Sequence, residues 1–211
     1  MYETMIVCGR DLDTKTDPIR RAGVIPFTVK NNSLYFLLGI DRGTRELTDF
    51  GGGVKSAETM VDGALREFTE ESCEIFSSTI TKEHIRHSPA IINSLQNSAI
   101  FFLRIDSHWI DTAEEVFDTY QKELRQIKKH NELIGIKWIV DSDFKLVAFN
   151  RRSQCMWKRI QNMLRMNTTW KELRLMLILG PELTNAVKDS WYLLSQNSTF
   201  TNVKYPKTCF Y

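Results

Sequence analysis

One stretch of the chain constrains its fold more than any other: three consecutive glycines followed by a strongly acidic helix. Gly51 to Gly53 follow a short apolar run that ends at Phe50, and helical periodicity begins a few residues later, over 59–72. Apolar residues recur on one face of this helix at i, i+3, i+4 and i+7: Val61, Ala64, Leu65 and Phe68. This spacing is typical of a helix packed on a core. The stretch therefore predicts a strand that ends at Phe50, a glycine loop and an amphipathic helix.

The other face of this helix carries carboxylates. Glu67, Glu70 and Glu71 fall within roughly 100° of arc, because successive helical residues are rotated by about 100°. Like charges at i,i+3 and i,i+4 destabilise a helix by about 0.2–0.5 kcal/mol per pair, and a bound cation would remove this repulsion. Clustered carboxylate oxygens suit hard divalent ions such as Mg²⁺, which also bind substrate phosphates. The alternative interpretation is a solvated acidic face that binds nothing.

The acidic residues have a fixed spacing from the glycines. Gly52 is followed by five residues, Glu58, seven residues and then Arg66-Glu67-Phe68-Thr69-Glu70-Glu71. This pattern resembles the signature of the Nudix hydrolase family. In that signature, the last glutamate is followed by any residue, a glycine and an apolar residue. Cys73 and Glu74 stand at those last two positions. Cys73 must therefore take a left-handed conformation at a cost of roughly 1 kcal/mol, or the helix must end differently.

The resemblance implies an activity and a set of site residues. It implies a pyrophosphohydrolase that depends on Mg²⁺, with Mn²⁺ as an alternative, and that cleaves a phosphoanhydride bond in a nucleoside diphosphate linked to another group. The metal ligands that it implies are Glu67, Glu70, Glu71 and the Gly51 carbonyl. Glu67 would be a further ligand or the general base, and Arg66 would hold it in place. Which glutamate acts as the base stays open.

Nudix enzymes often recruit one more carboxylate from outside the signature. Glu132, just before a predicted strand, is the first candidate. Glu114 and Glu115 rank lower, because a capping box that starts at Thr112 accounts for Glu115 without any chemistry.

Three basic residues flank the glycines: Arg42 and Arg45 before them, and Lys55 after them. In a Nudix-like fold, Arg42 and Arg45 would lie near the phosphate end of the cleft, where arginine can make bidentate phosphate contacts. Ser56 is expected to be the helix N-cap, and a helix N-terminus favours anions. The alternative for all three basic residues is an ordinary exposed loop charge.

The remaining pattern predicts an α/β fold. Strands are expected over 21–28, 34–40, 47–50, 98–105 and 133–140, and a helix over 111–127. This order favours a Nudix-like α/β/α sandwich with a mixed central sheet, an inserted helix and a helical C-terminal extension. The predicted divisions are an N-terminal arm (1–20), a Nudix hydrolase domain (21–148) and a helical extension packed on it (149–211). Met5 to Cys8 forms either an edge strand or part of a loose arm.

The C-terminal region has a basic window at residues 151–174. It holds seven basic residues against a single acid, Glu172. Trp157, Ile160 and Leu164 form an apolar stripe, which predicts a helix with a basic outer face. Such a face can bind an RNA backbone, so RNA is a candidate partner. An exposed helix face without a ligand is the alternative.

Composition bears on which functional classes and cellular environments the chain is compatible with. The net charge of +2 creates no overall field for nucleic acid. No apolar run approaches the roughly 18 residues of a membrane span, and no signal peptide is evident. The four cysteines lie far apart, which predicts a reduced, cytoplasmic environment. A nucleotide-type small molecule is the expected substrate, and the oligomeric state stays open. The rival function is a Nudix-fold module that binds a nucleotide or a partner without hydrolysing it.

Overall fold

The computed structural model describes residues 4–13, 20–126, 131–150, 155–164 and 167–179. The strands in this part of the chain are β1 (Thr4–Cys8), β2 (Arg21–Lys30), β3 (Ser33–Asp41), β4 (Leu47–Thr48), β5 (Phe50–Gly53), β6 (Pro89–Asn93), β7 (Ser98–Arg104) and β8 (Leu133–Val140). The helices are a 3-10 turn η1 (Gly9–Leu12), α1 (Met60–Glu71), α2 (Lys82–Arg86), α3 (Trp109–Gln126), α4 (Asp141–Phe149), α5 (Lys158–Leu164) and α6 (Asn167–Leu179).

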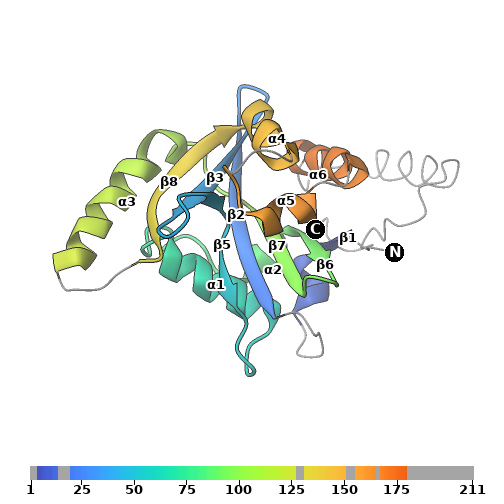
Figure 1. Cartoon of the computed structure of the whole chain (residues 1–211), viewed down its shortest axis with the longest axis horizontal. Coiled ribbons are helices and arrows are strands. Elements are labelled where there is room, and N and C mark those ends of the chain that lie inside the picture. Colours follow the sequence, from blue (N-terminus) through green and yellow to red (C-terminus); the bar gives the residue numbers. More distant parts are fainter. Residues whose placement is uncertain (1–3, 14–19, 127–130, 151–154, 165–166, 180–211) are drawn as a thin grey trace, which may run out of the picture.

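The strands form one mixed sheet (Figure 1). Its main path runs β1-β6-β7-β2-β3-β4, while β5 pairs with β2 and β8 pairs with β3. The β2–β7 pairing is parallel, and the other named strand pairs are antiparallel. The strand β2 is therefore shared: its first half pairs with the glycine strand β5, and its second half pairs with β3.

Two asparagines close the β2–β3 hairpin. Asn31 and Asn32 both have positive φ, at 53° and 60°. Asparagine tolerates this region well, and two left-handed residues match the twist of a two-residue hairpin. This tight turn joins the two strands that the sequence predicts over 21–28 and 34–40.

Helices cover both faces of the sheet, because side chains alternate along each strand. Val24 and Phe101 face one core, which α1, α2 and α3 cover. Ile25 and Phe102 face the other core, which α4, α5 and α6 cover. The fold is an α/β sandwich around a mixed sheet, as predicted.

Several local predictions were wrong. Residues 72–79 form successive turns, and β6 and α4 were not predicted. The helix α3 begins at Trp109, so Thr112 lies inside it and bonds back to the His108 carbonyl. The capping box at Thr112 is therefore absent. The part of the predicted helical extension beyond Leu179 falls outside the described residues.

The N-terminal strand and the cysteines can also be compared with the predictions. The strand β1 lies at the edge of the sheet and pairs with β6, which is the first of the two alternatives for Met5 to Cys8. Cys8 is disulfide-bonded, so the prediction of reduced cysteines is wrong for this residue. Among the described helices, none has the length and apolar character that crossing a membrane requires.

Candidate active site

The glycines belong to a strand rather than to a loop. The strand β5 starts at Phe50 and includes all three glycines, which corrects the prediction that a strand ends at Phe50. Gly51 lies opposite Gly23 of β2. A Cβ on Gly51 would come within 2.3 Å of the Gly23 Cα, so only glycine allows the two strands to approach this closely.

A buried ion pair between Arg21 and Asp49 is hydrogen-bonded to the glycine strand β5. Arg21 donates from Nη1 to Asp49 Oδ2 and from Nη2 to Asp49 Oδ1, both at 2.7 Å. Its Nη2 also donates to the Gly51 carbonyl at 2.9 Å. Asp49 is fully buried, and its carboxylate lies against the bare backbone of Gly23, where a Cβ would come within 2.0 Å of Oδ2. Burial alone lowers the pKa of Arg21, but the charge and hydrogen bonds of Asp49 outweigh it and raise that pKa.

The helix α1 starts with a capping box. Thr59 is the N-cap: its Oγ1 accepts from the Asp62 N–H at 3.1 Å, and Asp62 Oδ2 accepts from the Thr59 N–H at 3.1 Å. These two bonds satisfy two of the free N–H groups of the first turn. The N-cap predicted at Ser56 is wrong, because Ser56 lies in the turn that precedes the helix.

Arg66 connects the helix, the strand and the intervening loop. Its Nε and Nη2 donate to the two Glu58 oxygens at 2.7 and 3.0 Å, and Nη2 also donates to the Gly53 carbonyl at 2.7 Å. Its Nη1 donates to Glu67 Oε1 at 2.7 Å and lies 3.4 Å from a Glu70 oxygen. The hydrogen bonds from Arg66 lower the pKa of Glu58. Arg66 is thus placed to orient Glu67, the role that the resemblance implies.

Two of the three carboxylates lie directly against the glycine strand. The Glu67 carboxylate lies over Gly52, where a Cβ would come within 2.5 Å of its Cδ. Glu71 is buried, and its Oε2 accepts from the Gly51 N–H at 2.7 Å. Burial, followed by the charge of Asp49, raises the pKa of Glu71 to about 9. The Glu70 side chain is 60% exposed.

The C-terminal end of α1 has Cys73 where the Nudix signature has a glycine. Cys73 and Glu74 both have left-handed φ, at 56° and 62°. The Glu74 N–H donates to the Thr69 carbonyl at 2.9 Å and the Cys73 N–H to the Glu70 carbonyl at 3.3 Å, which is the Schellman pattern. The first of the two predicted alternatives for Cys73 is therefore confirmed.

Glu74 offers a test of this strained ending. We expect Glu74→Gly to raise the free energy of unfolding by about 1 kcal/mol, because glycine adopts a left-handed conformation without the Cβ penalty. The side chain of Glu74 is exposed, so little packing is lost. Urea unfolding measures the change. Glu74→Ala is the control, since it removes the charge but keeps the Cβ; an equal gain in both variants would contradict the explanation from φ.

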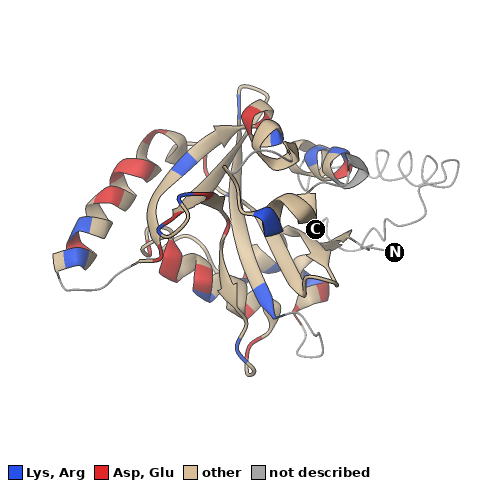
Figure 2. Cartoon of the chain, in the orientation of Figure 1, with Lys and Arg blue, Asp and Glu red and all other residues tan. Residues whose placement is uncertain are grey.

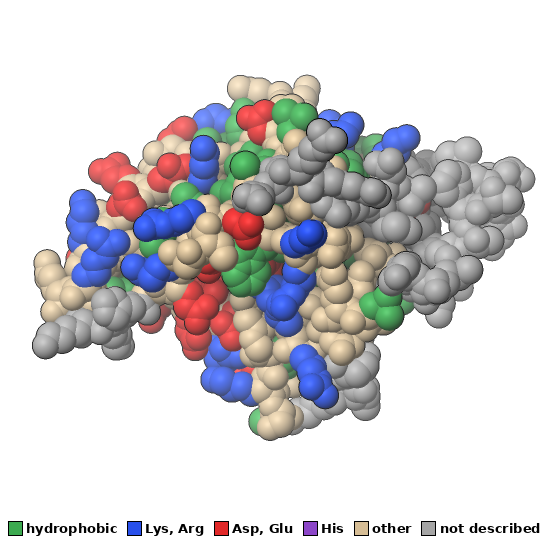
Figure 3. All heavy atoms as spheres, viewed as in Figure 1, with side chains coloured by type: hydrophobic (Ala, Val, Ile, Leu, Met, Phe, Trp, Pro, Cys, Tyr) green, Lys and Arg blue, Asp and Glu red, His purple; other side chains and the backbone are tan. Residues whose placement is uncertain are grey.

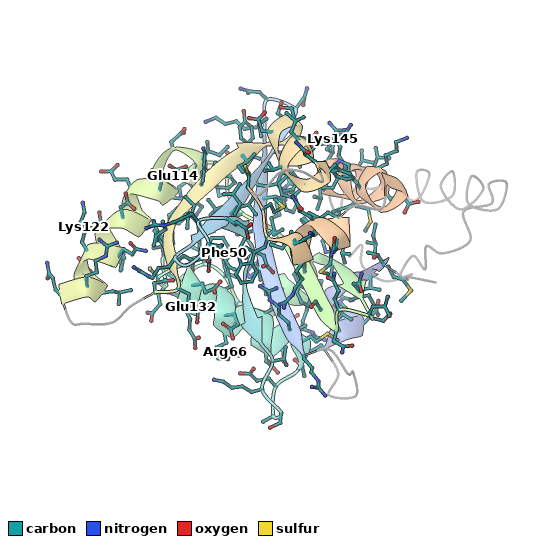
Figure 4. All side chains as sticks on the ribbon, viewed as in Figure 1. Phe50, Arg66, Glu114, Lys122, Glu132 and Lys145 are labelled. Atoms are coloured by element: carbon teal, nitrogen blue, oxygen red, sulfur yellow. The ribbon has the colours of Figure 1, made fainter. Side chains whose placement is uncertain are left out.

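The residues just before β8, which include Glu132, are hydrogen-bonded to the C-terminal end of α1. Asn131 Nδ2 donates to the Glu71 carbonyl at 2.9 Å, and Figure 4 shows the labelled Glu132 next to α1. The charge of Glu132 contributes to the raised pKa of Glu71. Glu114, by contrast, accepts from the Trp138 N–H at 3.2 Å and so serves the contact between α3 and β8. The structure thus places Glu132 near Glu71, close enough for its charge to act on that carboxyl group.

The predicted phosphate-binding residues have different surroundings. Arg42 binds the Glu132 segment, donating from its backbone N–H to the Glu132 carbonyl at 2.9 Å and from Nε to the Asn131 carbonyl at 3.0 Å. Arg45 is exposed, with a left-handed φ of 65°. Lys55 is exposed, and its charge helps to lower the pKa of Glu58. Lys and Arg side chains lie around the acidic group over α1 on the surface in Figure 3.

The site can be tested for its fit to a divalent cation. Its donors are carboxylate oxygens, the ligands that Mg²⁺ prefers, and Gly52 leaves space that the Glu67 carboxylate fills. Within the described residues, no three His, Cys, Asp or Glu side chains are grouped so that they could hold a metal ion. Instead, Glu67 pairs with Arg66 and Glu71 binds Gly51. The residues therefore fit a hard cation by donor type, but their side chains are not grouped around a common position in this structure.

The predicted basic window does not form one helix. Its described part is divided between α5 and α6, and both cover the sheet face opposite to α1. Lys158, Arg159 and Lys171 are exposed, whereas Arg174 donates from Nε to Asp141 Oδ2 at 2.5 Å. Figure 2 shows the basic residues of α5 and α6 on a different part of the molecule from the acidic residues of α1. Arg151, Arg152 and Arg165 lie outside the described residues.

Arg21, Asp49 and Asn131 are site residues that sequence reasoning missed. Asp49 offered one indication: it is an acid between Thr48 and Phe50, in a short segment predicted to be a strand. A buried acid needs a partner, and Arg21 at the start of a strand was available. Asn131 had no comparable signal, because its contacts join parts of the chain that are far apart in sequence.

No protein-family model and no curated protein matches this chain. Solved structures with a similar fold include a MutT/nudix family protein from Enterococcus faecalis, with a TM-score of 0.36 and 14% identity over 59% of this chain. The alignment spans 44% of that protein's length. Two structures of C. elegans Ap4A hydrolase, one of them a binary complex, have TM-scores of 0.39 and 0.41, both at 16% identity. These alignments cover 72% and 73% of this chain and 98% of each hydrolase chain. Such values do not establish family membership, so the function is argued from the residues of the site.

Proposed function

We propose that the chain is a Mg²⁺-dependent pyrophosphohydrolase that cleaves a phosphoanhydride bond in a nucleoside diphosphate linked to another group. One observation carries the proposal: the acidic face of α1 packs against a strand of bare glycines. Glu67 lies over Gly52 and Glu71 binds the Gly51 N–H. The absence of side chains on these glycines leaves the room in which the two carboxylates lie against the strand.

Each residue has a role in this proposal. Glu67, Glu70 and Glu71 would hold Mg²⁺, with Glu132 as the extra carboxylate. Bound Mg²⁺ neutralises phosphoryl oxygens and makes water more acidic. The Gly51 carbonyl already accepts from Arg21, so it would contribute only its second lone pair.

Proton transfer and substrate binding fall to the other side chains. Glu67 is the candidate for taking a proton from the attacking water, if it is not itself a ligand, and Arg66 orients it. Arg45, Lys55 and the unbound part of the Arg42 guanidinium would contact the phosphates of the substrate.

Turnover of a nucleotide panel tests the proposal. The panel contains nucleoside triphosphates, nucleotide sugars, dinucleoside polyphosphates and capped RNA, each with and without Mg²⁺, followed by identification of the phosphate products. We expect Mg²⁺-dependent cleavage of at least one class at a phosphoanhydride bond. Binding of a nucleotide without turnover would favour the rival function, a non-catalytic module. If the chain neither binds nor cleaves any member of the panel, both the proposed function and the rival function are contradicted.

RNA stays a candidate substrate or partner through the 151–174 window. Its binding can be tested by the dependence of RNA affinity on salt, since each neutralised phosphate contributes about −0.7 to −0.9 to the slope. A flat response would remove RNA from the candidates. A steep salt dependence that is lost in the Lys158→Ala/Arg159→Ala variant would indicate that RNA binds at these two exposed residues.

The glycine strand provides a matched pair of variants. We expect Gly52→Ala to lower Mg²⁺-dependent turnover about 100-fold, because the new Cβ would come within 2.5 Å of Glu67 Cδ and displace the carboxylate. Gly53→Ala is the control, since a Cβ there has nothing within 4 Å. Steady-state kinetics on the substrate that the panel identifies would measure both. Equal effects of the two variants would contradict the proposed position of Glu67.

A further inference from the structure

The backbone of Gly51 is bonded to two charged side chains. Its N–H donates to Glu71 Oε2 at 2.7 Å, and its carbonyl accepts from Arg21 Nη2 at 2.9 Å. Glu71 is the last residue of α1, and Arg21 is the first residue of β2. A single glycine therefore connects Arg21 to a carboxylate of the acidic helix.

The Arg21 guanidinium has a fixed orientation. It donates to both oxygens of Asp49 at 2.7 Å, and this planar two-point contact sets the direction of its remaining donors. Asp49 is itself held, because it is fully buried and its Oδ1 also accepts from Thr48 Oγ1 at 3.2 Å. The Nη2 group that bonds Asp49 Oδ1 is also the one that bonds the Gly51 carbonyl. Asp49 thus orients the donor that holds Gly51.

Gly51 depends on such contacts more than another residue would. Glycine has the widest range of φ and ψ, so bonds to other groups must fix its backbone. A larger residue is excluded here, since a Cβ on Gly51 would come within 2.3 Å of the Gly23 Cα. The direction of the Gly51 N–H, and with it the hydrogen bond to Glu71, therefore depends in part on Arg21.

Arg21 also interacts with the acidic helix through its charge. Burial lowers the pKa of Arg21, whereas the charges of Asp49, Glu71 and Glu67 raise it. The guanidinium thus lies within electrostatic range of two carboxylates that the proposed function uses. Because a charge acts without a hydrogen bond, a test has to separate the charge of Arg21 from its geometry.

We propose that Arg21 is a positioning residue, which fixes the Gly51 backbone and thereby holds the Glu71 carboxylate in the orientation that hydrolysis requires. The inference rests on the proposed function and deepens it. Arg21 acts through Gly51 rather than on the substrate, and Asp49 supports Arg21 in this role.

Steady-state kinetics of Arg21→Lys tests the inference, on the substrate that the panel identifies. Lysine keeps the positive charge beside Asp49 but lacks the planar fork that binds Asp49 and Gly51 together. We expect kcat to fall about 10- to 100-fold, the range for groups that orient metal ligands, with KM nearly unchanged. Lys30→Arg, the reverse exchange at the other end of β2, is the matched control and should keep the wild-type kcat, since its exposed pairing with Asp111 is retained. Thermal unfolding of both variants confirms that folded protein is assayed.

A second background shows whether Arg21 acts through Glu71. In Glu71→Gln, which already lacks the carboxylate, Arg21→Lys is expected to lower kcat little further. An equal loss of kcat in both backgrounds would contradict the positioning role. So would a wild-type kcat in folded Arg21→Lys, or a change confined to KM.

Hydrogen exchange of the Gly51 amide tests the positioning without any turnover. We expect the Gly51 N–H to exchange faster in Arg21→Lys than in the wild-type protein, relative to the Ile105 N–H, which bonds the Phe27 carbonyl. Unchanged relative exchange would contradict the inference. If wild-type protein cleaves no member of the panel, the proposed function fails whatever the exchange shows, so the two failures are distinguishable.

Discussion

We expect Glu71→Gln to lower Mg²⁺-dependent hydrolysis by at least about 100-fold, the effect of removing one preorganised charge from an active site. Glutamine has nearly the same size, and its Oε1 can still accept from the Gly51 N–H that now binds Glu71. The helix and the strand should therefore stay in contact, and the circular dichroism spectrum should not change. Glu70→Gln is expected to behave in the same way, since its side chain is exposed and loses only a weak contact with Arg66.

Glu115→Gln is the control for these two variants. Glu115 is an exposed glutamate on α3, so its substitution changes the net charge equally without touching the site. Steady-state kinetics over a range of Mg²⁺ concentrations would compare the three. Retained turnover in both Glu70→Gln and Glu71→Gln would contradict the assignment of the ligands.

The largest stability effect is expected at the ion pair beneath the glycine strand. Asp49→Ala should lower the free energy of unfolding by about 3–5 kcal/mol, because it leaves the buried Arg21 without its charge partner. The exposed pair of Lys30 and Asp111 provides the control, with side chains that are 39% and 69% exposed. Asp111→Ala should cost less than about 1 kcal/mol.

Replacing both members of the buried pair refines this prediction. Arg21→Met/Asp49→Leu should lose less stability than Asp49→Ala alone, since no buried charge is left unpaired. Denaturant unfolding of the four proteins would measure the differences. A cost for Asp49→Ala no larger than that for Asp111→Ala would show that the pair is not effectively buried. The double variant also frees the Gly51 carbonyl, so its activity reports whether Arg21 matters beyond stability.

The acidic helix was predictable because its evidence is local. The spacing of Glu67, Glu70 and Glu71 against an apolar stripe depends only on helical geometry, and the structure has the helix at Met60–Glu71. The N-cap was misplaced because serine and threonine are both good caps. The deciding residue was Asp62 at the third helical position, which completes a capping box with Thr59.

The parts that were missed depend on contacts between distant segments. The strand β6 has five residues and is stabilised by β1 and β7, which lie on either side of it. The pairing of Arg21 with Asp49 spans 28 residues, and the bond from Asn131 to the Glu71 carbonyl spans 60. No local pattern specifies such pairs. Buried polar groups nevertheless need partners, and this rule would have marked Asp49 as a residue to explain.

The central claim is that the acidic face of α1 binds a divalent cation. Isothermal titration calorimetry of Mg²⁺ and Mn²⁺ into the full chain, compared with a Glu70→Gln/Glu71→Gln variant, tests it most directly. We predict saturable binding by the wild-type protein and no measurable binding by the variant. Binding of equal strength in both proteins, or none in either, would contradict the claim.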